Sequence, residues 1–470
     1  MKKLLCIIAV FAMALSLCAC GENAAPAAQE DVPPISIGFA RGDITPEGSV
    51  PLAGYGYTYK RMSTEVLDPL SMTCLAMTDG TNTAIVFTHD LYISTNNWVP
   101  TIRSNIYATH KIPQENIMVC ATNNHSGPDP RTVGDTYRDM FISTAEKLAA
   151  EAIADMAPAN LYGATTVTEG MNFVRHYILE DGSVAGEYYG DFSAAPIKEH
   201  AAEGDHELVL LKIDRTGDKQ DILVMNYQAH PLFTSGEKET VISADFIGAA
   251  RSKVEKDTGM LCAYFTGATA EMDPISRMES EDHGMDHIAY GEKLAQYAID
   301  ALPNMKLLGG SQVQVSYLAY NCAVNHYGEE LAELAPQVIE LWEQTDIETG
   351  NALARELGFS SVFHAEAIQA RPSRPSKKPI VLGAVGVGGF GFVAAPYRMF
   401  SSNGMYVKQE SPFELTMVFT EANEAWPNIA AKEAYEYGSY ESDCSYYAEG
   451  MGERVAEVFV DLLELVKKPT

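Results

Sequence analysis

The sequence predicts an α/β fold in which mixed β-sheets are flanked by helices. Short apolar runs with the length and composition of strands alternate along the chain with longer segments of helical periodicity. The chain has 470 residues. Roughly 435 of them follow a Pro-rich stretch that ends at residue 34, which is enough for one large domain or two closely packed ones. We find no internal repeat and no second linker, so we expect one large domain.

The expected elements follow the apolar runs in order. Strands are expected at residues 84–88, 117–121, 208–213, 222–227 and 262–265. Helices are expected at residues 98–110, 139–156, 248–258, 286–302, 329–343 and 451–467. Residues 385–392 read Val-Gly-Val-Gly-Gly-Phe-Gly-Phe and lack the Lys-Ser/Thr of a phosphate-binding loop. We expect this run to be a loop or an irregular strand edge.

The N-terminus has the pattern of an export signal. Met-Lys-Lys precedes an apolar run over residues 4–17, and the small residues around Ala19 follow it. This is typical of a signal peptide and is too short for a membrane span. Leu17-Cys18-Ala19-Cys20 resembles the lipobox of bacterial lipoproteins. We therefore expect a signal peptide over residues 1–19, a flexible tether over 20–34 and a folded domain over 35–470.

Cys20 is the residue expected to carry the lipid, which would anchor the protein outside the cytoplasm at the bacterial cell surface. Replacing Cys20 with alanine is then expected to release the protein from membrane fractions. Fractionation of the two forms followed by immunoblotting checks this. Membrane association that the Cys20→Ala substitution leaves unchanged would rule out the lipid anchor.

The charge of the chain excludes some partners. Its formal net charge is −30, and loss of residues 1–19 removes two lysines and no acid, leaving −32. So acidic a surface repels nucleic acid and anionic membranes, but it does not exclude neutral lipids or cationic ligands. Protein partners are not predictable from the sequence.

Five cysteines remain after residue 20, with no CxxC spacing, and Cys120 and Cys262 within apolar runs are expected to be core thiols.

The segment 117–130, Ile-Met-Val-Cys-Ala-Thr-Asn-Asn-His-Ser-Gly-Pro-Asp-Pro, is the first candidate for a functional site. An apolar strand here ends abruptly in amide, imidazole and hydroxyl groups, and binding and catalytic groups are often carried this way. The alternative is a strand followed by a simple turn, with His125 hydrogen-bonded within it.

Further motifs carry a resemblance to a known family. They are Asp-Ile-Thr-Pro at 43–46, Gly-Tyr-Gly at 54–56, Asn-Tyr-Gln-Ala-His-Pro at 226–231, Ile-Ser-Ala-Asp-Phe at 242–246 and Glu-Met-Asp-Pro at 271–274. With the 117–130 segment, Asn172-Phe-Val-Arg175 and Glu421-Ala-Asn423, their order resembles the neutral (non-lysosomal) ceramidase family over essentially the whole domain. The resemblance implies the catalytic fold of that family without its C-terminal immunoglobulin-like domain.

The resemblance also implies a zinc amidohydrolase, whose metal polarises an amide carbonyl and activates water. The family ligands are two histidines, a glutamate and a tyrosine. His230 matches one histidine, whereas Asn123, Arg398 and Asn428 stand at the other three positions. An amide is a poor zinc ligand and a guanidinium cannot be one. We therefore expect zinc to be absent or weakly bound, with His230 and His125 as the available ligands, and ceramide to be hydrolysed poorly.

Roles follow for the remaining candidates. We expect catalytic roles for His125, Asp273 and Arg175, and contact with substrate for Asn123, Arg398, Asn428 and Asp245. Arg398 is expected to pair with Asp273 or Glu271, or with an anionic group of a ligand. His125, His230, Asp273, Arg398 and Asn428 should converge on one cleft at strand ends.

His283 and His287 lie four residues apart, a spacing that suits either a metal site or a charged helix N-terminus, and we favour the latter.

Two functions from different classes remain. The first is a lipid-anchored amidohydrolase that acts on ceramide or another N-acyl amide through a rebuilt site. The second is a non-catalytic, metal-free lipoprotein that binds a ligand in the old pocket. Zinc content separates them, because the family chemistry requires a stoichiometric metal.

Overall fold

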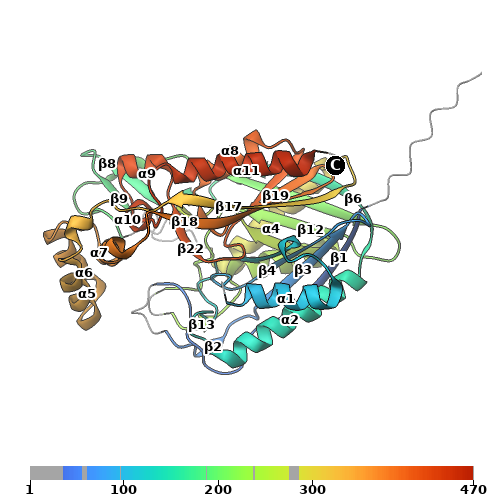
Figure 1. Ribbon diagram of the computed structural model, residues 1–470, viewed down its shortest axis with the longest axis horizontal. Helices are drawn as coiled ribbons and strands as arrows, with labels where there is room; N and C mark the ends of the chain where they lie inside the picture. Colours follow the sequence, from blue (N-terminus) through green and yellow to red (C-terminus); the bar gives the residue numbers. More distant parts are fainter. Residues whose placement is uncertain are drawn as a thin grey trace, which may run out of the picture. The chain divides into compact units, whose positions relative to one another are not determined.

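Two β-sheets lie face to face and carry helices on their outer surfaces (Figure 1). The computed structural model describes residues 35–55, 61–95, 97–186, 188–236, 239–274 and 285–468. The expected signal peptide (1–19), the expected tether (20–34), Cys20 and His283 lie outside these residues. In the described part of the chain no helix is both long and apolar enough to span a membrane.

The larger sheet is mixed. Its parallel pairs are β12 with β14 and β4 with β5, and the other neighbours along it are antiparallel. Among the described residues it contains, in spatial order, β14 (Leu261–Thr266), β12 (Ile222–Tyr227), β11 (Glu207–Arg215), β6 (Ala157–Val167), β1 (Ser36–Asp43), β3 (Ser71–Thr78), β4 (Thr83–His89) and β5 (Ile117–Ala121), with β16 (Lys306–Leu307) beside β6.

The smaller sheet packs against it. It contains β17 (Val313–Ala323), β18 (Lys377–Val387), β19 (Phe390–Ala394) and β21 (Leu415–Phe419). Phe265 of β14 stacks on Phe419 of β21 with ring centroids 4.0 Å apart. Burial of large apolar side chains between two sheet faces supplies most of the driving force for such packing.

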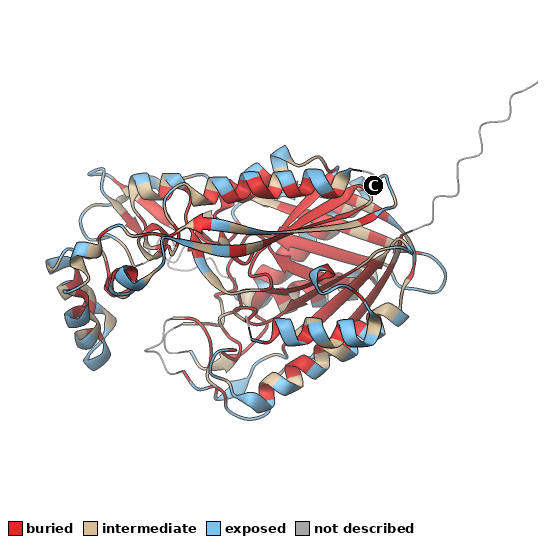
Figure 2. Cartoon of the chain, viewed as in Figure 1, coloured by how far each residue is buried: buried red, intermediate tan, exposed pale blue. Residues whose placement is uncertain are grey.

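Helices cover the outer faces because side chains alternate along each strand. In β4, Ala84 and Val86 face the smaller sheet, whereas Ile85 and Phe87 face helices. Figure 2 shows the buried sides of these helices turned toward the sheets. The helices are α1 (Val99–His110), α2 (Asp135–Ala154), α3 (Asp245–Thr258) and α4 (His287–Ala301) on the larger sheet, and α8 (Ser401–Glu410) and α11 (Met451–Lys467) on the smaller one.

A helical excursion leaves the smaller sheet between β17 and β18. It packs through Phe363 onto Tyr440 of α10 with ring centroids 5.6 Å apart. Its helices are α5 (Ala335–Gln344), α6 (Ile347–Glu356) and α7 (Val362–Ala370), and α9 (Lys432–Tyr437) precedes α10 (Tyr440–Cys444). Short pairings complete the described fold: β2 (Glu65–Val66) with β13 (Val241–Ile242), β7 (Phe173–Val174) with β15 (Met272–Asp273), β20 (Tyr397–Met399) with β22 (Trp426–Ile429), and β8 (His176–Leu179) between β9 (Val184–Gly186) and β10 (Ile197–His200).

The predicted α/β fold with mixed sheets is confirmed, and the five expected strands all form. The expectation of a loop or an irregular strand edge at 385–392 is wrong for most of this run, because residues 385–387 end β18, residues 390–392 begin β19 in the middle of the smaller sheet, and only Gly388 and Gly389 form the turn between them. Glycine is required there by packing: a Cβ at Gly386 or Gly391 would lie 2.7 or 2.5 Å from the ring of Phe413.

The helix expected at 329–343 begins later, because Pro336 lies in its first turn and the helix starts at Ala335.

Candidate functional site

The polar loop after β5 is held at the ends of two parallel strand pairs. The backbone N–H of Thr122 donates to His89 O at the end of β4 (2.9 Å), and Thr266 Oγ1 at the end of β14 donates to Thr122 O (2.8 Å). Carboxyl ends of parallel strands are a common location for binding sites. Asn123 adopts a left-handed backbone conformation (φ 62°), which asparagine tolerates better than most residues.

His125 lies at the centre of this region. Its ring has edge-on contacts with Tyr92, Tyr55 and His230, with centroids 4.8, 5.4 and 6.0 Å away. Neither of its ring nitrogens has a hydrogen-bond partner among the described residues. Burial lowers the pKa of His125 well below the usual value, and the neighbouring His230 and arginines add to this, so the ring is neutral at neutral pH.

His230 follows β12 and is fixed in one tautomer. Its Nδ1 lies 3.0 Å from Met272 O and 3.4 Å from Asp273 Oδ1. A carbonyl oxygen only accepts, so Nδ1 carries the proton and Nε2 keeps its lone pair. Burial lowers the pKa of His230, although Asp273 opposes the shift. His230 is therefore a neutral, oriented base.

Arg175 and Glu441 support Asp273 from behind. Arg175 Nη1 lies 3.5 Å from Asp273 Oδ1, and Arg175 Nε donates to Glu441 Oε1 (2.9 Å). His176 Nε2 lies 2.7 Å from Glu441 Oε2. Burial opposes ionisation of the Glu441 carboxyl, but Arg175 and His176 outweigh it and lower its pKa. These contacts fix the carboxylate that faces His230.

Arg398 pairs differently from our expectation. Its Nε lies 2.9 Å from Glu421 Oε1, and its two Nη atoms contact Tyr92 Oη and, at 3.4 Å, Asn428 Oδ1. The predicted pairing with Asp273 or Glu271 is wrong. Asp273 is taken by Arg175, and Glu271 Oε1 accepts from Ser401 N (2.9 Å).

The structure brings together the five residues expected to converge, since contacts connect His230 to Asp273 and His125, His125 to Tyr92, and Tyr92 through Arg398 to Asn428. We call them, with Arg175 and Asn123, the His125 cluster. Asn123 is fully buried two residues before His125, and neither atom of its amide has a partner in the described residues. The chemical roles of these residues stay predictions.

Glu421, Tyr92 and Glu441 were missed as members of the site. Glu421 is fully buried and has a left-handed backbone (φ 56°), as does Asn423 (φ 70°). Backbone strain of this kind is often found at functional sites. The signal in the sequence for Glu421 is its place in the Glu421-Ala-Asn423 motif, which by itself assigns it no role.

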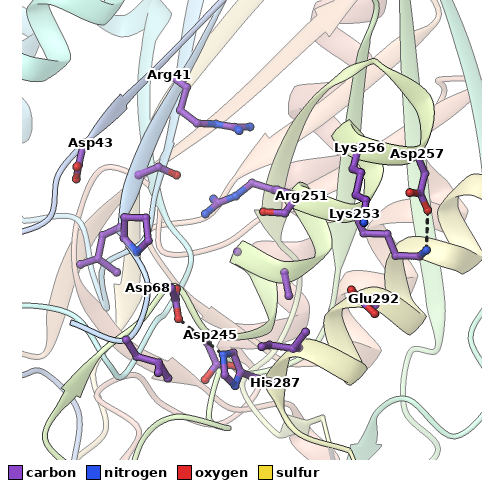
Figure 3. Close-up of a pocket in the computed structure, with 18 of the residues that line it drawn as sticks. Arg41, Asp43, Asp68, Asp245, Arg251, Lys253, Lys256, Asp257, His287 and Glu292 are labelled. Carbon is purple, nitrogen blue, oxygen red and sulfur yellow. Dashed lines mark hydrogen bonds and ion pairs between the residues drawn. The ribbon is translucent and has the colours of Figure 1, made fainter. Parts of the chain in front are cut away.

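Asp245 lies apart from the direct contacts of the cluster. It lines a pocket of about 670 Å³ between α3, the start of α4, the end of β1 and the segment that leads into β3 (Figure 3), and His125, His230 and Arg398 do not line this pocket. Its Oδ2 accepts from Thr234 N (2.8 Å) and Thr234 Oγ1 (2.9 Å), and Thr234 Oγ1 also lies within hydrogen-bond distance of Ser126 Oγ (3.0 Å). Asp245 thus supports the loop indirectly, and its contact with substrate stays a prediction.

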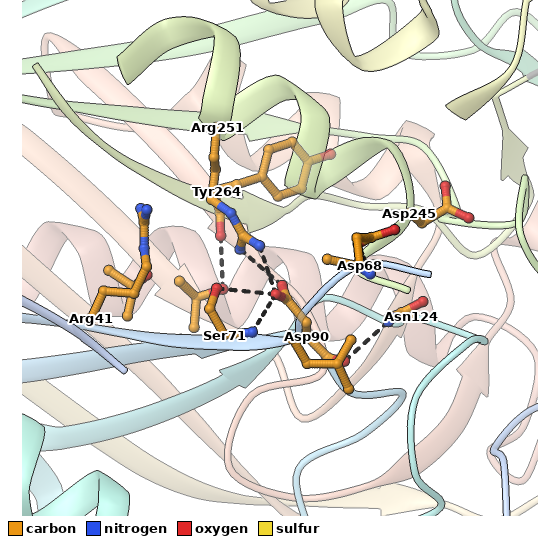
Figure 4. Close-up of polar contacts among 12 residues, drawn as sticks. Arg41, Asp68, Ser71, Asp90, Asn124, Asp245, Arg251 and Tyr264 are labelled. Carbon is orange, nitrogen blue, oxygen red and sulfur yellow. Dashed lines mark hydrogen bonds and ion pairs between the residues drawn. The ribbon is translucent and has the colours of Figure 1, made fainter. Parts of the chain in front are cut away.

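A buried ion pair between Arg251, which lines the pocket, and Asp90 connects the pocket with the loop (Figure 4). Arg251 donates twice to Asp90 (2.9 and 2.6 Å), and Ser71 N donates to the same carboxylate (2.8 Å). Asn124 Nδ2 donates to the backbone oxygens of Asp90 and Ser243. The pair therefore fixes the end of β4, to which Asn124 ties the loop after β5 that carries Asn123 and His125.

The cluster offers two imidazoles, His125 and His230, and the carboxylate of Asp273 as donors to a metal. Zinc needs at least three protein ligands, and Arg398 brings a fixed positive charge to the same place, so weak or absent zinc binding stays a prediction. In the described ranges no three His, Cys, Asp or Glu side chains are arranged to hold a metal. His287 is the first residue of α4, at a charged helix N-terminus as expected. Its Nε2 lies 3.7 Å from Asp68 Oδ2.

Comparison with known proteins identifies the fold. No protein-family model matches the sequence, and no curated protein matches it significantly. Among solved structures it is similar to the neutral ceramidase from Pseudomonas aeruginosa (TM-score 0.68) and to a ceramidase complexed with C2 (TM-score 0.70). Each match has 14% identity and covers 92% of this chain and 75% of the other. The chain thus has the fold of the neutral ceramidases.

Proposed function

We propose that the protein is an amidohydrolase that cleaves a linear N-acyl amide at the His125 cluster. The observation that carries this proposal is the orientation of His230: with Nδ1 bonded to Met272 O and near Asp273, Nε2 is left as a base. The ceramidase fold supports the same reaction class, although fold alone does not determine chemistry.

The chemistry follows from the residues present. His230 Nε2 removes a proton from water as the water oxygen attacks the carbonyl carbon, and Asp273 stabilises the resulting imidazolium. The unpartnered N–H groups of His125 and Asn123 are available to the oxygen that becomes negative. The C–N bond then breaks, and the proton moves from His230 to the departing amine nitrogen. The products are a carboxylic acid and an amine.

We further propose that this reaction proceeds without zinc. A dication beside Arg398 is disfavoured by several kcal/mol at short range, by Coulomb's law at an intermediate dielectric. The lipid anchor at Cys20, if present, would hold the enzyme near amphipathic amides at the outer surface.

Metal content tests the zinc-free proposal. Elemental analysis of the purified protein is expected to find well below one zinc per chain, and hydrolysis of a synthetic N-acyl amide should persist in a chelator. The variant Arg398→Glu with Asn123→His and Asn428→Tyr restores the family ligand types and is expected to bind zinc.

About one zinc per wild-type chain, the stoichiometry of a catalytic site, would overturn the metal-free mechanism. A folded triple variant that stays metal-free would show that the site has been placed wrongly. Absence of hydrolysis with every amide tried, in metal-free and zinc-supplemented buffer, would overturn the hydrolase itself.

A further inference from the structure

Positive charge is concentrated around His125. Its two tyrosine neighbours each carry a guanidinium on the ring: Arg61 lies 4.9 Å from the centroid of Tyr55, and Arg398 lies 4.9 Å from that of Tyr92. Arg61 Nη2 also donates to the backbone oxygen of His125 (2.9 Å). Cation–π contacts of this kind are strongest where water is excluded.

Two further arginines at the edge of the cluster are neutralised by carboxylates. Arg131, on the ring of Tyr92, donates to both oxygens of Asp129 at 2.9 Å. Arg175 is held by Glu441 and Asp273. These pairs add no net charge to the site.

Arg61 and Arg398 are less well compensated. The two Nη atoms of Arg61 bond to backbone oxygens, including those of Gly236 and Glu239 at 3.0 Å, whereas in the described part of the chain its Nε has no partner and Arg61 forms no ion pair. Arg398 contacts a carboxylate only through Nε, at Glu421, and its Nη1 has the long 3.4 Å contact with Asn428. The Nη1 side of the Arg398 guanidinium is therefore the part best suited to another hydrogen-bond acceptor.

This local excess contrasts with the net charge of −30 for the whole chain. Exposed acids more than about 10 Å away are largely screened in salt solution. The nearby guanidiniums therefore dominate the electrostatic potential that a ligand meets inside the cluster. Elsewhere on the molecule the acidic surface repels anions.

We propose that the amide cleaved by this enzyme carries a carboxylate, as in an N-acyl amino acid, and that Arg398 binds this carboxylate beside the scissile bond. This inference rests on the proposed hydrolase. A planar guanidinium pairs with a carboxylate through two parallel N–H···O bonds, which gives geometric selection as well as attraction. Neutral ceramide offers no such group.

Glu421 does not prevent an incoming carboxylate from approaching Arg398. Burial raises the pKa of Glu421 to about 7, against the opposing effect of Arg398. The Glu421 carboxyl is therefore able to take up a proton near neutral pH when a ligand anion approaches, so the two carboxylates need not both be charged. Burial likewise raises the pKa of Glu271 to about 8, which keeps that carboxyl protonated.

The test compares N-lauroylglycine with N-lauroylglycinamide, which differ by one charge at almost the same size, and with a short-chain ceramide. The wild-type enzyme is expected to show a kcat/KM at least about tenfold higher for the carboxylate, the scale of one charged hydrogen-bonded contact. Arg398→Gln should bring this ratio close to one, and Arg398→Lys should retain part of it. Arg138→Gln, an exposed arginine of α2, is the matched control and should keep the wild-type ratio.

Equal hydrolysis of the acid and the amide by the wild-type enzyme would overturn the carboxylate inference while leaving the hydrolase intact. A preference for ceramide would do the same. Hydrolysis of none of the three would overturn the proposed function as well. Since the wild-type ratio needs no variant, the test holds even if Arg398→Gln fails to fold.

Discussion

Replacing His230 with alanine is expected to lower kcat/KM for N-acyl amide hydrolysis by a factor of about 10² to 10⁴, the usual contribution of a general base. His230 is the side chain whose Nδ1 is bonded to Met272 O, with Asp273 near, so that Nε2 is free to take a proton from water. Loss of the ring removes this base and leaves the other members of the cluster in place. Initial rates with N-lauroylglycine measure the effect.

The pH profile distinguishes a base from a purely structural residue. Burial lowers the pKa of His230 from its usual value of 6.5, so the wild-type ring stays unprotonated as the pH falls through 6.5. The acid limb of kcat/KM should accordingly lie below pH 6.5. Because the shift is downward, the stability associated with this neutral ring is present above pH 6.5 and is lost as the pH falls below it.

His287→Ala is the matched control, since His287 lines the separate pocket of Figure 3 and lies outside the His125 cluster. It should retain wild-type kcat/KM. If His230→Ala folds and keeps more than about a tenth of the wild-type kcat/KM, well above the range for loss of a general base, His230 is not the base. If instead His287→Ala is the inactive variant, the active site lies at the other pocket.

Replacing Asp90 with alanine is expected to lower the free energy of unfolding by about 3–5 kcal/mol, the range for a buried charge left without its partner. Both Asp90 and Arg251 are buried, and the two hydrogen bonds between them would be lost (Figure 4). Ser71 N would lose its acceptor as well. Guanidinium unfolding followed by circular dichroism measures the change.

Two control variants show whether the decrease in the free energy of unfolding comes from the unpaired buried charge. Arg138→Ala removes an exposed arginine with two ion pairs on α2 and should leave stability unchanged within error. Asp90→Leu combined with Arg251→Met replaces the whole pair by apolar groups and should recover most of the stability lost in Asp90→Ala. A single Asp90→Ala variant as stable as the wild type would contradict a fixed ion pair between Asp90 and Arg251.

The sequence by itself determined much of the fold. Apolar runs of strand length located β5 and β12 at their observed bounds, because both strands are buried along their whole length. The 3.6-residue periodicity located α11 in the same way. The prediction from sequence failed at β18 and β19, where the packing of Phe413 against Gly386 and Gly391 favours glycine in a buried strand. A local pattern does not contain this contact between distant residues.

For the site too, the sequence determined one part and the tertiary structure decided the other. Motif order identified His125, His230, Asp273, Arg175, Arg398 and Asn428, which the structure joins through direct contacts and through Tyr92. The ion-pair partners depended on the tertiary structure alone: Glu421 rather than Asp273 or Glu271 faces Arg398, and Glu441 holds Arg175. Residue type gives a side chain its charge, but only the folded chain sets which opposite charge lies within 4 Å, and the Coulomb energy depends on that distance.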